Sequence, residues 1–290
     1  MKSEMERRDF IRSGGLIIGG VFATSLATRK AEAAQSNGRT RKALGWGMLQ
    51  EKTLSLEDRL KVIKDAGFEG IEVSRAAAKK AETDPRELAA AAQKVGVVIH
   101  GVSNGGNGDL DAAIEEAAIY GATTVLHVVR ADANVSYLEN YKRSQDLIRA
   151  AIPKAEQKKI KICVENVWAT FLIEPMGMAR YLDEIGSPWV RSYFDIGNVM
   201  RWGWPQQWIE VLGKRIEKIH IKEFSLKTAM KEGMSKAFDF PIGQGDIDWK
   251  RVREELAKIE FHDWATAEVR GGDRKRIAEI SSEMDRVLFS

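Results

Sequence analysis

The sequence predicts an α/β protein, a closed (β/α)8 barrel in a single domain, and two observations support this fold class. After residue 43, short apolar and β-branched runs alternate with longer amphipathic patterns of helical period, as βα units around a parallel sheet do. Eight such units follow one another in about 250 residues, the usual size of this barrel. A doubly wound open sheet is the alternative, but no glycine-rich phosphate loop follows the first expected strand.

The eight expected strands are short, and we place them at Leu44–Met48, Gly70–Val73, Val97–Val102, Thr124–Val129, Ile160–Glu165, Val190–Asp195, Ile216–Ile221 and Trp264–Val269. Helices are expected between them, for example at Asp84–Val95, Asp109–Tyr120, Ser136–Lys158 and Trp249–Ile259. Several boundaries carry an acidic cap with a following proline, or a glycine where a helix ends. These boundary residues are Asp84-Pro85, Gly67, Gly96, Gly121 and Gly186.

One connection is unusually long and runs from Lys222 to about Asp248, after the seventh expected strand. Long connections in compact domains are usually functional or disordered. The aromatic residues, proline and glycines between Phe238 and Asp246 favour an ordered flap over the mouth of the barrel. Disorder of the Lys227–Lys236 part is the alternative.

The N-terminal segment has the pattern of an export signal. Residues 6–12 read Glu-Arg-Arg-Asp-Phe-Ile-Arg and precede an apolar stretch from Gly14 to Ala27, which resembles a twin-arginine (Tat) signal. As a helix this stretch would span about 21 Å, short of a membrane core of roughly 30 Å, so no stable membrane span is expected. A small-residue cleavage pattern ends at Ala33. We therefore expect a Tat signal at 1–33, a linker at 34–43, the barrel at 44–290, and a periplasmic or otherwise exported protein; an amphipathic N-terminal helix is the alternative.

The charge balance and the single cysteine bound the class of protein further. The chain has 45 Lys and Arg against 42 Asp and Glu, and the net charge of +3 is spread thinly. Nucleic acid is therefore not the expected partner. Cys163 is the single cysteine of the sequence, so no internal disulfide is expected. The sequence leaves the oligomeric state open.

The chemistry is expected at the carboxyl ends of the strands, where (β/α)8 barrels build their active sites. Four candidate ligands stand at or next to the ends of expected strands five to eight, namely Glu165, Asp195, His220 and Glu268. Carboxylates are costly to desolvate beside an apolar core unless a cation compensates them. A lone buried acid is more often an ion-pair partner, but four candidates in succession predict a metal site. The set suits one divalent ion, Mn²⁺, Mg²⁺ or Co²⁺, and Zn²⁺ less well.

Five short motifs lie around these residues and before the last helix: Val164–Asn166, Phe194–Asn198, Ile219–Glu223, Gly243–Trp249 and Ala267–Val269. With these motifs the chain resembles the xylose isomerase-like TIM barrels, a family that includes sugar 3-epimerases, and the resemblance covers residues 44–290. The resemblance implies that the four candidate ligands bind one divalent ion. It also implies that Glu165 and Glu268 act as the acid and base on opposite faces of a sugar.

The sequence departs from the 3-epimerases at two places. They commonly carry a histidine three residues after the strand-six aspartate, where this chain has Asn198. The basic residue near the strand-seven histidine is Lys222, two residues after His220, so both side chains can face the mouth if the strand persists. Lys222 is thus a third candidate catalytic residue, and a solvated surface lysine is the alternative.

Five residues near strand ends are candidate substrate contacts: Trp46, Glu72, Trp168, Asn198 and Arg270. The aromatic faces of Trp46 and Trp168 could stack on sugar C–H surfaces, although packing under loops is as common. Glu72 could bond the substrate or a ligand, with a structural ion pair as the alternative. Arg270 follows strand eight, where barrels often hold phosphate, but export favours a neutral sugar. His100 lies within a strand and is expected to be a core histidine.

These observations predict an enzyme that acts on a small-molecule sugar. The leading hypothesis is a metal-dependent isomerase or epimerase of a keto-sugar or related polyol ketone that works through an enediolate. A lyase or hydrolase of 3-keto-glycosides would use the same ligands and expel a leaving group. A non-catalytic, exported carbohydrate-binding barrel is the alternative from another class, and it would not need two opposed carboxylates.

Overall fold

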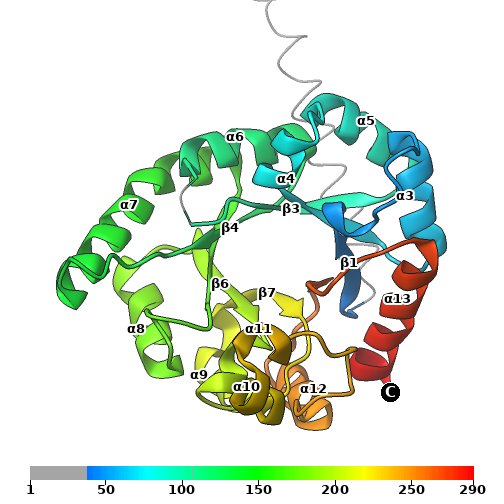
Figure 1. Cartoon of the computed structure of the whole chain (residues 1–290). Helices are drawn as coiled ribbons and strands as arrows, with labels where there is room; N and C mark the ends of the chain where they lie inside the picture. The colour runs from blue at the N-terminus through cyan, green and yellow to red at the C-terminus, as the bar shows by residue number, and fades with distance from the viewer. Residues whose placement is uncertain (1–37, 107) are drawn as a thin grey trace, which may run out of the picture. The chain divides into compact units, whose positions relative to one another are not determined.

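The computed structural model describes residues 38–106 and 108–290 (Figure 1). The predicted export signal at residues 1–33 lies outside the described residues and stays a prediction. The compact unit that carries the fold is Thr40–Ser290. Within the described part of the chain, no helix is both long enough and apolar enough to cross a membrane.

In the described residues, eight parallel strands form a closed barrel in which each strand pairs with the next one along the chain. The strands are β1 (Arg41–Gly45), β2 (Gly70–Ser74), β3 (Val98–Ser103), β4 (Thr124–Val128), β5 (Lys161–Glu165), β6 (Val190–Asp195), β7 (Ile216–Ile221) and β8 (Trp264–Ala267). The barrel closes where β1 pairs with β8, with Ala43 opposite Thr266. This is the predicted (β/α)8 or TIM barrel, so the predicted fold class is confirmed.

Helices surround the strands in Figure 1, on the connections that follow each strand. The described α-helices are α3 (Leu56–Asp65), α4 (Arg75–Lys80), α5 (Pro85–Val95), α6 (Leu110–Tyr120), α7 (Tyr137–Lys158), α8 (Pro175–Ile185), α9 (Pro205–Leu212), α10 (Leu226–Glu232), α11 (Met234–Ala237), α12 (Trp249–Lys258) and α13 (Arg274–Phe289). Short 3-10 turns are η1 (Trp46–Met48), η2 (Asn198–Arg201) and η3 (Gly213–Arg215). The predicted starts of α5, α6 and α7 are one residue early because Asp84, Asp109 and Ser136 cap these helices.

The largest difference from the predicted strands is at β1, which begins at Arg41, three residues earlier than expected. Sequence patterns favour apolar residues, but here two basic residues enter the strand with partners for their charges. The Arg41 guanidinium carbon lies 4.0 Å from the centre of the Trp264 ring, and Lys42 Nζ donates to Ser281 Oγ at 2.8 Å. The predicted end of this strand, Trp46–Met48, forms η1 instead.

The inside of the barrel is separate from the apolar layer between strands and helices. Leu126, Cys163 and Tyr193 form a small cluster of their own there, because successive side chains of a strand point to opposite faces. By the same alternation Glu165 and Asp195, two residues after Cys163 and Tyr193, face the inside at the carboxyl end. The fold thus turns acidic side chains into the mouth of the barrel.

Candidate metal centre

Four consecutive strands bring one candidate ligand each to the carboxyl end of the barrel. Glu165 is the last residue of β5, Asp195 is the last of β6, and His220 is the last but one of β7. In the register between β6 and β7, Asp195 lies opposite His220. Glu268 directly follows β8, and its backbone N–H donates to the Ile221 carbonyl at 2.9 Å. The sheet therefore places the four side chains next to one another.

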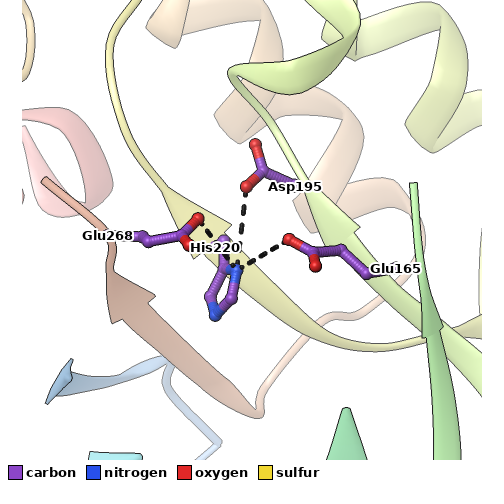
Figure 2. A group of neighbouring side chains, drawn as sticks. All are labelled: Glu165, Asp195, His220 and Glu268. Atoms are coloured by element: carbon purple, nitrogen blue, oxygen red, sulfur yellow. Dashed lines mark hydrogen bonds and ion pairs between the residues drawn. The ribbon is translucent and has the colours of Figure 1, made fainter. Parts of the chain in front are cut away.

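The four side chains converge on one point, and we call them the ligand cluster: Glu165, Asp195, His220 and Glu268. One ligand atom from each lies within 4.8 Å of the others. Figure 2 shows the carboxylates around His220, whose Nδ1 is 3.2 Å from Glu165 Oε1, 3.7 Å from Asp195 Oδ2 and 3.3 Å from Glu268 Oε2. A single ring nitrogen carries at most one hydrogen, so it cannot satisfy three carboxylates. A cation would satisfy all of them, and the cluster could hold a divalent ion.

Burial makes this group of acids unfavourable without a compensating charge. Glu165, Asp195 and His220 are buried, whereas the side chain of Glu268 is half-exposed. Burial raises the pKa of Glu165 from 4.5 to about 7, and the charges of Glu268 and Asp195 add to that rise. For His220, burial acts to lower the pKa, but nearby negative groups outweigh it and raise the pKa well above its ordinary value.

Lys222 brings a positive charge into the same cluster. Its Nζ lies 2.8 Å from Asp195 Oδ2 and 2.6 Å from Glu268 Oε2. Burial acts to lower the pKa of Lys222, but the two carboxylates outweigh it and raise that pKa. Burial likewise acts to raise the pKa of Glu268, yet the charges of Lys222 and His220 hold it well below its usual range. Lys222 therefore faces the ligand cluster and keeps Glu268 ionised.

Two asparagines fix the position of Asp195. The Asp195 backbone N–H donates to Asn166 Oδ1 at 2.9 Å, and Asn166 Nδ2 donates back to the Asp195 carbonyl at 2.8 Å. The Asn198 backbone N–H donates to Asp195 Oδ1 at 2.8 Å. Asn198 Oδ1 also accepts from Lys222 Nζ at 3.3 Å. Sequence reasoning gave Asn166 no role of its own, although its place directly after Glu165 was the available signal.

Among the other predicted substrate contacts, Glu72 touches a ligand and Trp168 lies in the loop after a ligand-bearing strand. Glu72 is buried in β2, and its Oε1 lies 3.2 Å from His220 Nε2. Trp168 is 40% exposed in the loop after β5. Its carbonyl accepts from the indole N–H of Trp202 at 3.0 Å. Glu72 therefore contacts the ligand cluster directly, whereas Trp168 is partly exposed, with the Arg201 guanidinium carbon 5.8 Å from its ring centre.

Trp46 and Arg270 are placed differently. Trp46 is buried beneath the guanidinium of Arg59, whose carbon lies 4.6 Å from the ring centre. Arg270 is mostly exposed, with Asp239 at 3.9 Å. Among the described residues, neither side chain makes a hydrogen bond or ion pair with the ligand cluster.

The long connection after β7 contains α10 and α11 and is anchored by one buried carboxylate. Glu223 accepts from the backbone N–H of Gly243 at 2.7 Å and from the indole N–H of Trp249 at 2.9 Å. The ring of Phe238 lies 5.4 Å from Lys222 Nζ, so the connection reaches the mouth. Sequence reasoning missed the anchor, and the signal for it was an acidic residue directly after Lys222.

Replacing Glu223 by glutamine is expected to loosen this connection and to lower Tm. Hydrogen bonds to a charged group contribute about 1.5–3 kcal/mol, and glutamine would turn one oxygen into a donor that faces N–H groups. About 1 kcal/mol shifts the Tm of a domain of this size by about 2–4 °C, so we expect a loss of about 3–12 °C. Faster hydrogen exchange between residues 226 and 249, measured by mass spectrometry, should accompany it. The control Glu232→Gln, exposed at the end of α10, should change neither quantity; a normal Glu223→Gln protein would contradict the anchor.

Comparison with protein-family models shows to which family the chain belongs. The family model of the xylose isomerase-like TIM barrel matches residues 60–287. The chain belongs to this family. The matched range contains the whole ligand cluster, Lys222 and the connection anchored by Glu223. The resemblance of the strand-end motifs to the xylose isomerase-like TIM barrels is therefore confirmed.

Several individual proteins are similar to this chain at low sequence identity. SgbU of Escherichia coli (strain K12), which is provisionally named an L-ribulose-5-phosphate 3-epimerase, is 25% identical over 242 residues, covering 72% of this chain and 82% of SgbU. The IOLI protein with a bound zinc atom is 17% identical, with a TM-score of 0.73 over 86% of this chain and 98% of that protein. The 3-keto-D-glucoside 4-epimerase YcjR from E. coli is 14% identical, with a TM-score of 0.68 over 86% and 99%. The two structures show that the fold is shared.

Proposed function

We propose that this chain is a divalent-metal-dependent isomerase or epimerase of a keto-sugar or related polyol ketone. The observation that carries the proposal is the ligand cluster, in which four consecutive strand ends bring one atom each within 4.8 Å of the others. Membership of the xylose isomerase-like TIM barrels supports it. Similarity to a protein provisionally named an L-ribulose-5-phosphate 3-epimerase supports a small-molecule sugar as the substrate.

The proton transfer falls to two residues of the chain. A divalent ion at the ligand cluster would polarise a substrate carbonyl and stabilise the enediolate that forms next to it. In Figure 2 the carboxylates of Glu165 and Glu268 lie on opposite sides of the His220 imidazole, 3.2 and 3.3 Å from its Nδ1. One carboxylate can remove the α-proton from one face while the other delivers a proton to the opposite face, which inverts the carbon.

The neighbouring residues prepare these carboxylates and the substrate. The Lys222 ammonium, 2.6 Å from Glu268 Oε2, keeps Glu268 ionised and therefore able to accept a proton. Asn198 Oδ1 accepts from Lys222 and the Asn198 backbone N–H donates to the Asp195 carboxylate, so Asn198 keeps that ammonium in place. The partly exposed indole of Trp168, three residues after Glu165, is the surface on which we expect a sugar ring to stack.

A lyase or hydrolase of 3-keto-glycosides is the second candidate, and exposed indoles near the mouth favour it. Trp168, Trp202 and Trp204 follow β5 and β6 and are 40, 53 and 60% exposed. The Arg201 guanidinium carbon lies 4.4 Å from the centre of the Trp202 ring and 5.8 Å from that of Trp168. Such aromatic faces could receive the leaving group of a glycoside beside its keto-sugar.

A substrate screen in heavy water separates the two candidates. Metal-replete protein is incubated with keto-sugars and with 3-keto-glycosides, and the products are read by NMR for deuterium at the α-carbon and for bond cleavage. With an isomerase or epimerase, deuterium should appear at the α-carbon of the sugar, and the bond to the leaving group should stay intact. A lyase or hydrolase should release the leaving group. Absence of both exchange and cleavage across the screen, with metal bound, would favour the carbohydrate-binding alternative and contradict the proposal.

A further inference from the structure

A line of polar side chains runs through the inside of the barrel and ends at His220. Its members are buried and come from five different strands, and the proposed proton transfer uses none of them. We call this line the buried polar chain: Lys218, His100, Thr266, Tyr193 and Glu72. A barrel interior of this kind is usually filled by branched apolar side chains. Burying polar groups is costly unless each finds a partner, so the partners of each member determine where its hydrogens must lie.

The first members lie within hydrogen-bond distance of one another. Lys218 Nζ is 3.1 Å from His100 Nδ1, and it also donates to the His100 carbonyl at 2.5 Å and to Thr123 Oγ1 at 3.1 Å. His100 Nε2 is 2.9 Å from Thr266 Oγ1. Thr266 Oγ1 is in turn 3.1 Å from the hydroxyl of Tyr193. The contacts form one continuous line from Lys218 to Tyr193.

Lys218 determines which atoms donate and which accept along the buried polar chain. Burial lowers the pKa of Lys218, but three acceptors surround its Nζ and match the three hydrogens of an ammonium, which has no acceptor of its own. His100 Nδ1 must therefore accept, and the hydrogen of a neutral His100 must sit on Nε2 and point to Thr266. Burial first, and then the charge of Lys218, hold the pKa of His100 well below its ordinary value, as a neutral ring requires.

The same reasoning assigns the hydrogens of Thr266 and Tyr193 and leads to Glu72. Thr266 accepts from His100, and the Tyr193 oxygen, 3.1 Å away, is the acceptor within reach of the Thr266 hydroxyl hydrogen among the described residues, so we assign that hydrogen to Tyr193. The phenol hydrogen then needs a different acceptor. Glu72 Oε2 is buried and has no hydrogen-bond partner within the described residues, and the charge of Glu72, after burial, raises the pKa of the Tyr193 phenol. We assign the Tyr193 hydrogen to this open acceptor, because the ring of Tyr193 packs 4.4 Å from that of His220 between ring centres and Glu72 Oε1 contacts the same His220.

The last contact determines the state of His220. Glu72 Oε1 lies 3.2 Å from His220 Nε2, and an ionised carboxylate can only accept. We propose that the buried polar chain fixes His220 as the tautomer with its hydrogen on Nε2, which leaves the lone pair of Nδ1 for a metal ion. Glu72 and Tyr193 are positioning residues in this arrangement, since they act on the ion only through His220. The inference rests on the proposed metal site and names the residues that orient its histidine ligand.

NMR of protein labelled with ¹⁵N-histidine tests the hydrogen positions directly. The chain has four histidines, so the ring nitrogens can be assigned one by one. In chelator-treated wild-type protein we expect His100 to be neutral with its hydrogen on Nε2. After addition of Zn²⁺, which keeps the spectrum sharp, we expect His220 to be protonated on Nε2 and bound through Nδ1. A hydrogen on His100 Nδ1, or Zn²⁺ bound through His220 Nε2, would overturn the proposal.

Two substitutions that preserve shape test the effect on metal affinity. Glu72→Gln removes the charge that accepts from His220, and we expect Zn²⁺ affinity, measured by competition with a chelator, to fall about 10- to 100-fold. Tyr193→Phe keeps the ring that packs on His220 and removes only the hydroxyl, so a smaller loss in the same direction is expected. The control His127→Gln removes another buried histidine, on β4, whose Nδ1 has no hydrogen-bond partner among the described residues; it should keep the wild-type affinity.

The outcomes separate this inference from the proposed function. Failure of the wild-type protein to bind Zn²⁺ with His220 would contradict the metal site itself. Normal wild-type binding together with unchanged affinity in folded Glu72→Gln and Tyr193→Phe would contradict only the buried polar chain. A merely structural role of the chain would lower Tm in both variants and leave the Zn²⁺ affinity of the folded protein as it is in the wild type.

Discussion

Replacing either Glu165 or Glu268 by glutamine is expected to lower turnover by about 10²–10⁴-fold, because each variant loses one of the two groups that carry the proton. Glutamine keeps the size of the side chain, and its amide oxygen can still face the ion. Binding of metal and substrate should therefore suffer much less than turnover. Steady-state kinetics with metal content measured on the same samples checks this. Glu254→Gln, an exposed change on α12, is the matched control and should keep full activity.

The two variants should also differ from each other in heavy water. With a substrate of one configuration, the variant that keeps the abstracting carboxylate can still wash deuterium into the α-carbon, whereas the other variant cannot. With the epimeric substrate the roles of Glu165 and Glu268 exchange, and the pattern should reverse. Near-native turnover by both variants with normal metal binding would show that another base is used, and Lys222, 2.8 Å from Asp195, would then be the next candidate.

Removing the metal is expected to lower Tm by several degrees, because the carboxylates of the ligand cluster then repel one another in a buried mouth. An ion present at one hundred times its Kd stabilises the folded state by about 2.7 kcal/mol. For a domain of this size that corresponds to about 5–11 °C in Tm. Thermal unfolding with a chelator and with added Mn²⁺, Mg²⁺ or Co²⁺ measures the difference. Equal Tm values under all these conditions would contradict the site.

The gain in Tm on metal binding should depend on pH, and the pKa of Glu165 determines whether that gain rises or falls with pH. Burial first raises this pKa from 4.5 to about 7, so the contribution of neutral Glu165 to stability is full below about pH 4.5 and is lost as pH rises through about 7. An ion needs the ionised carboxylate and competes with the proton. Metal affinity should therefore rise between pH 5 and 7, and the Tm gain should be larger at pH 8 than at pH 5.5. The same gain at both pH values would show that Glu165 does not bind the ion.

The barrel could be predicted because its signals are local. Each βα unit has its own short β-rich run followed by a longer amphipathic helical pattern. The predicted bounds of β6 and β7 agree with the observed ones. The ligand cluster followed from the same logic, since consecutive strand ends of a closed barrel must meet. The start of β1 could not be predicted in this way, because Arg41 is accommodated by Trp264, which is distant in sequence.

The contacts between distant strands could not be predicted from patterns at all. Glu72 and His220 are 148 residues apart, and Lys218 and His100 are 118 apart. Their contacts depend on the register and shape of the closed sheet across the barrel interior. His100 was expected to be a core histidine, and its bonded partners agree with that expectation. Its link through Thr266 to Tyr193, which packs on His220, depends on the three-dimensional arrangement of the strands.

The central claim is that a bound ion and two carboxylates move a proton beside a sugar carbonyl. The most direct test is a metal titration in which deuterium exchange into the substrate is measured. Chelator-treated protein in heavy water is given increasing Mn²⁺, and deuterium in the recovered substrate is measured by mass spectrometry. We expect almost no exchange without the ion, a rate that rises in proportion to the added ion, and a plateau at one ion per chain. Full exchange in the chelator-treated protein, or a rate that does not respond to the ion, would contradict the claim.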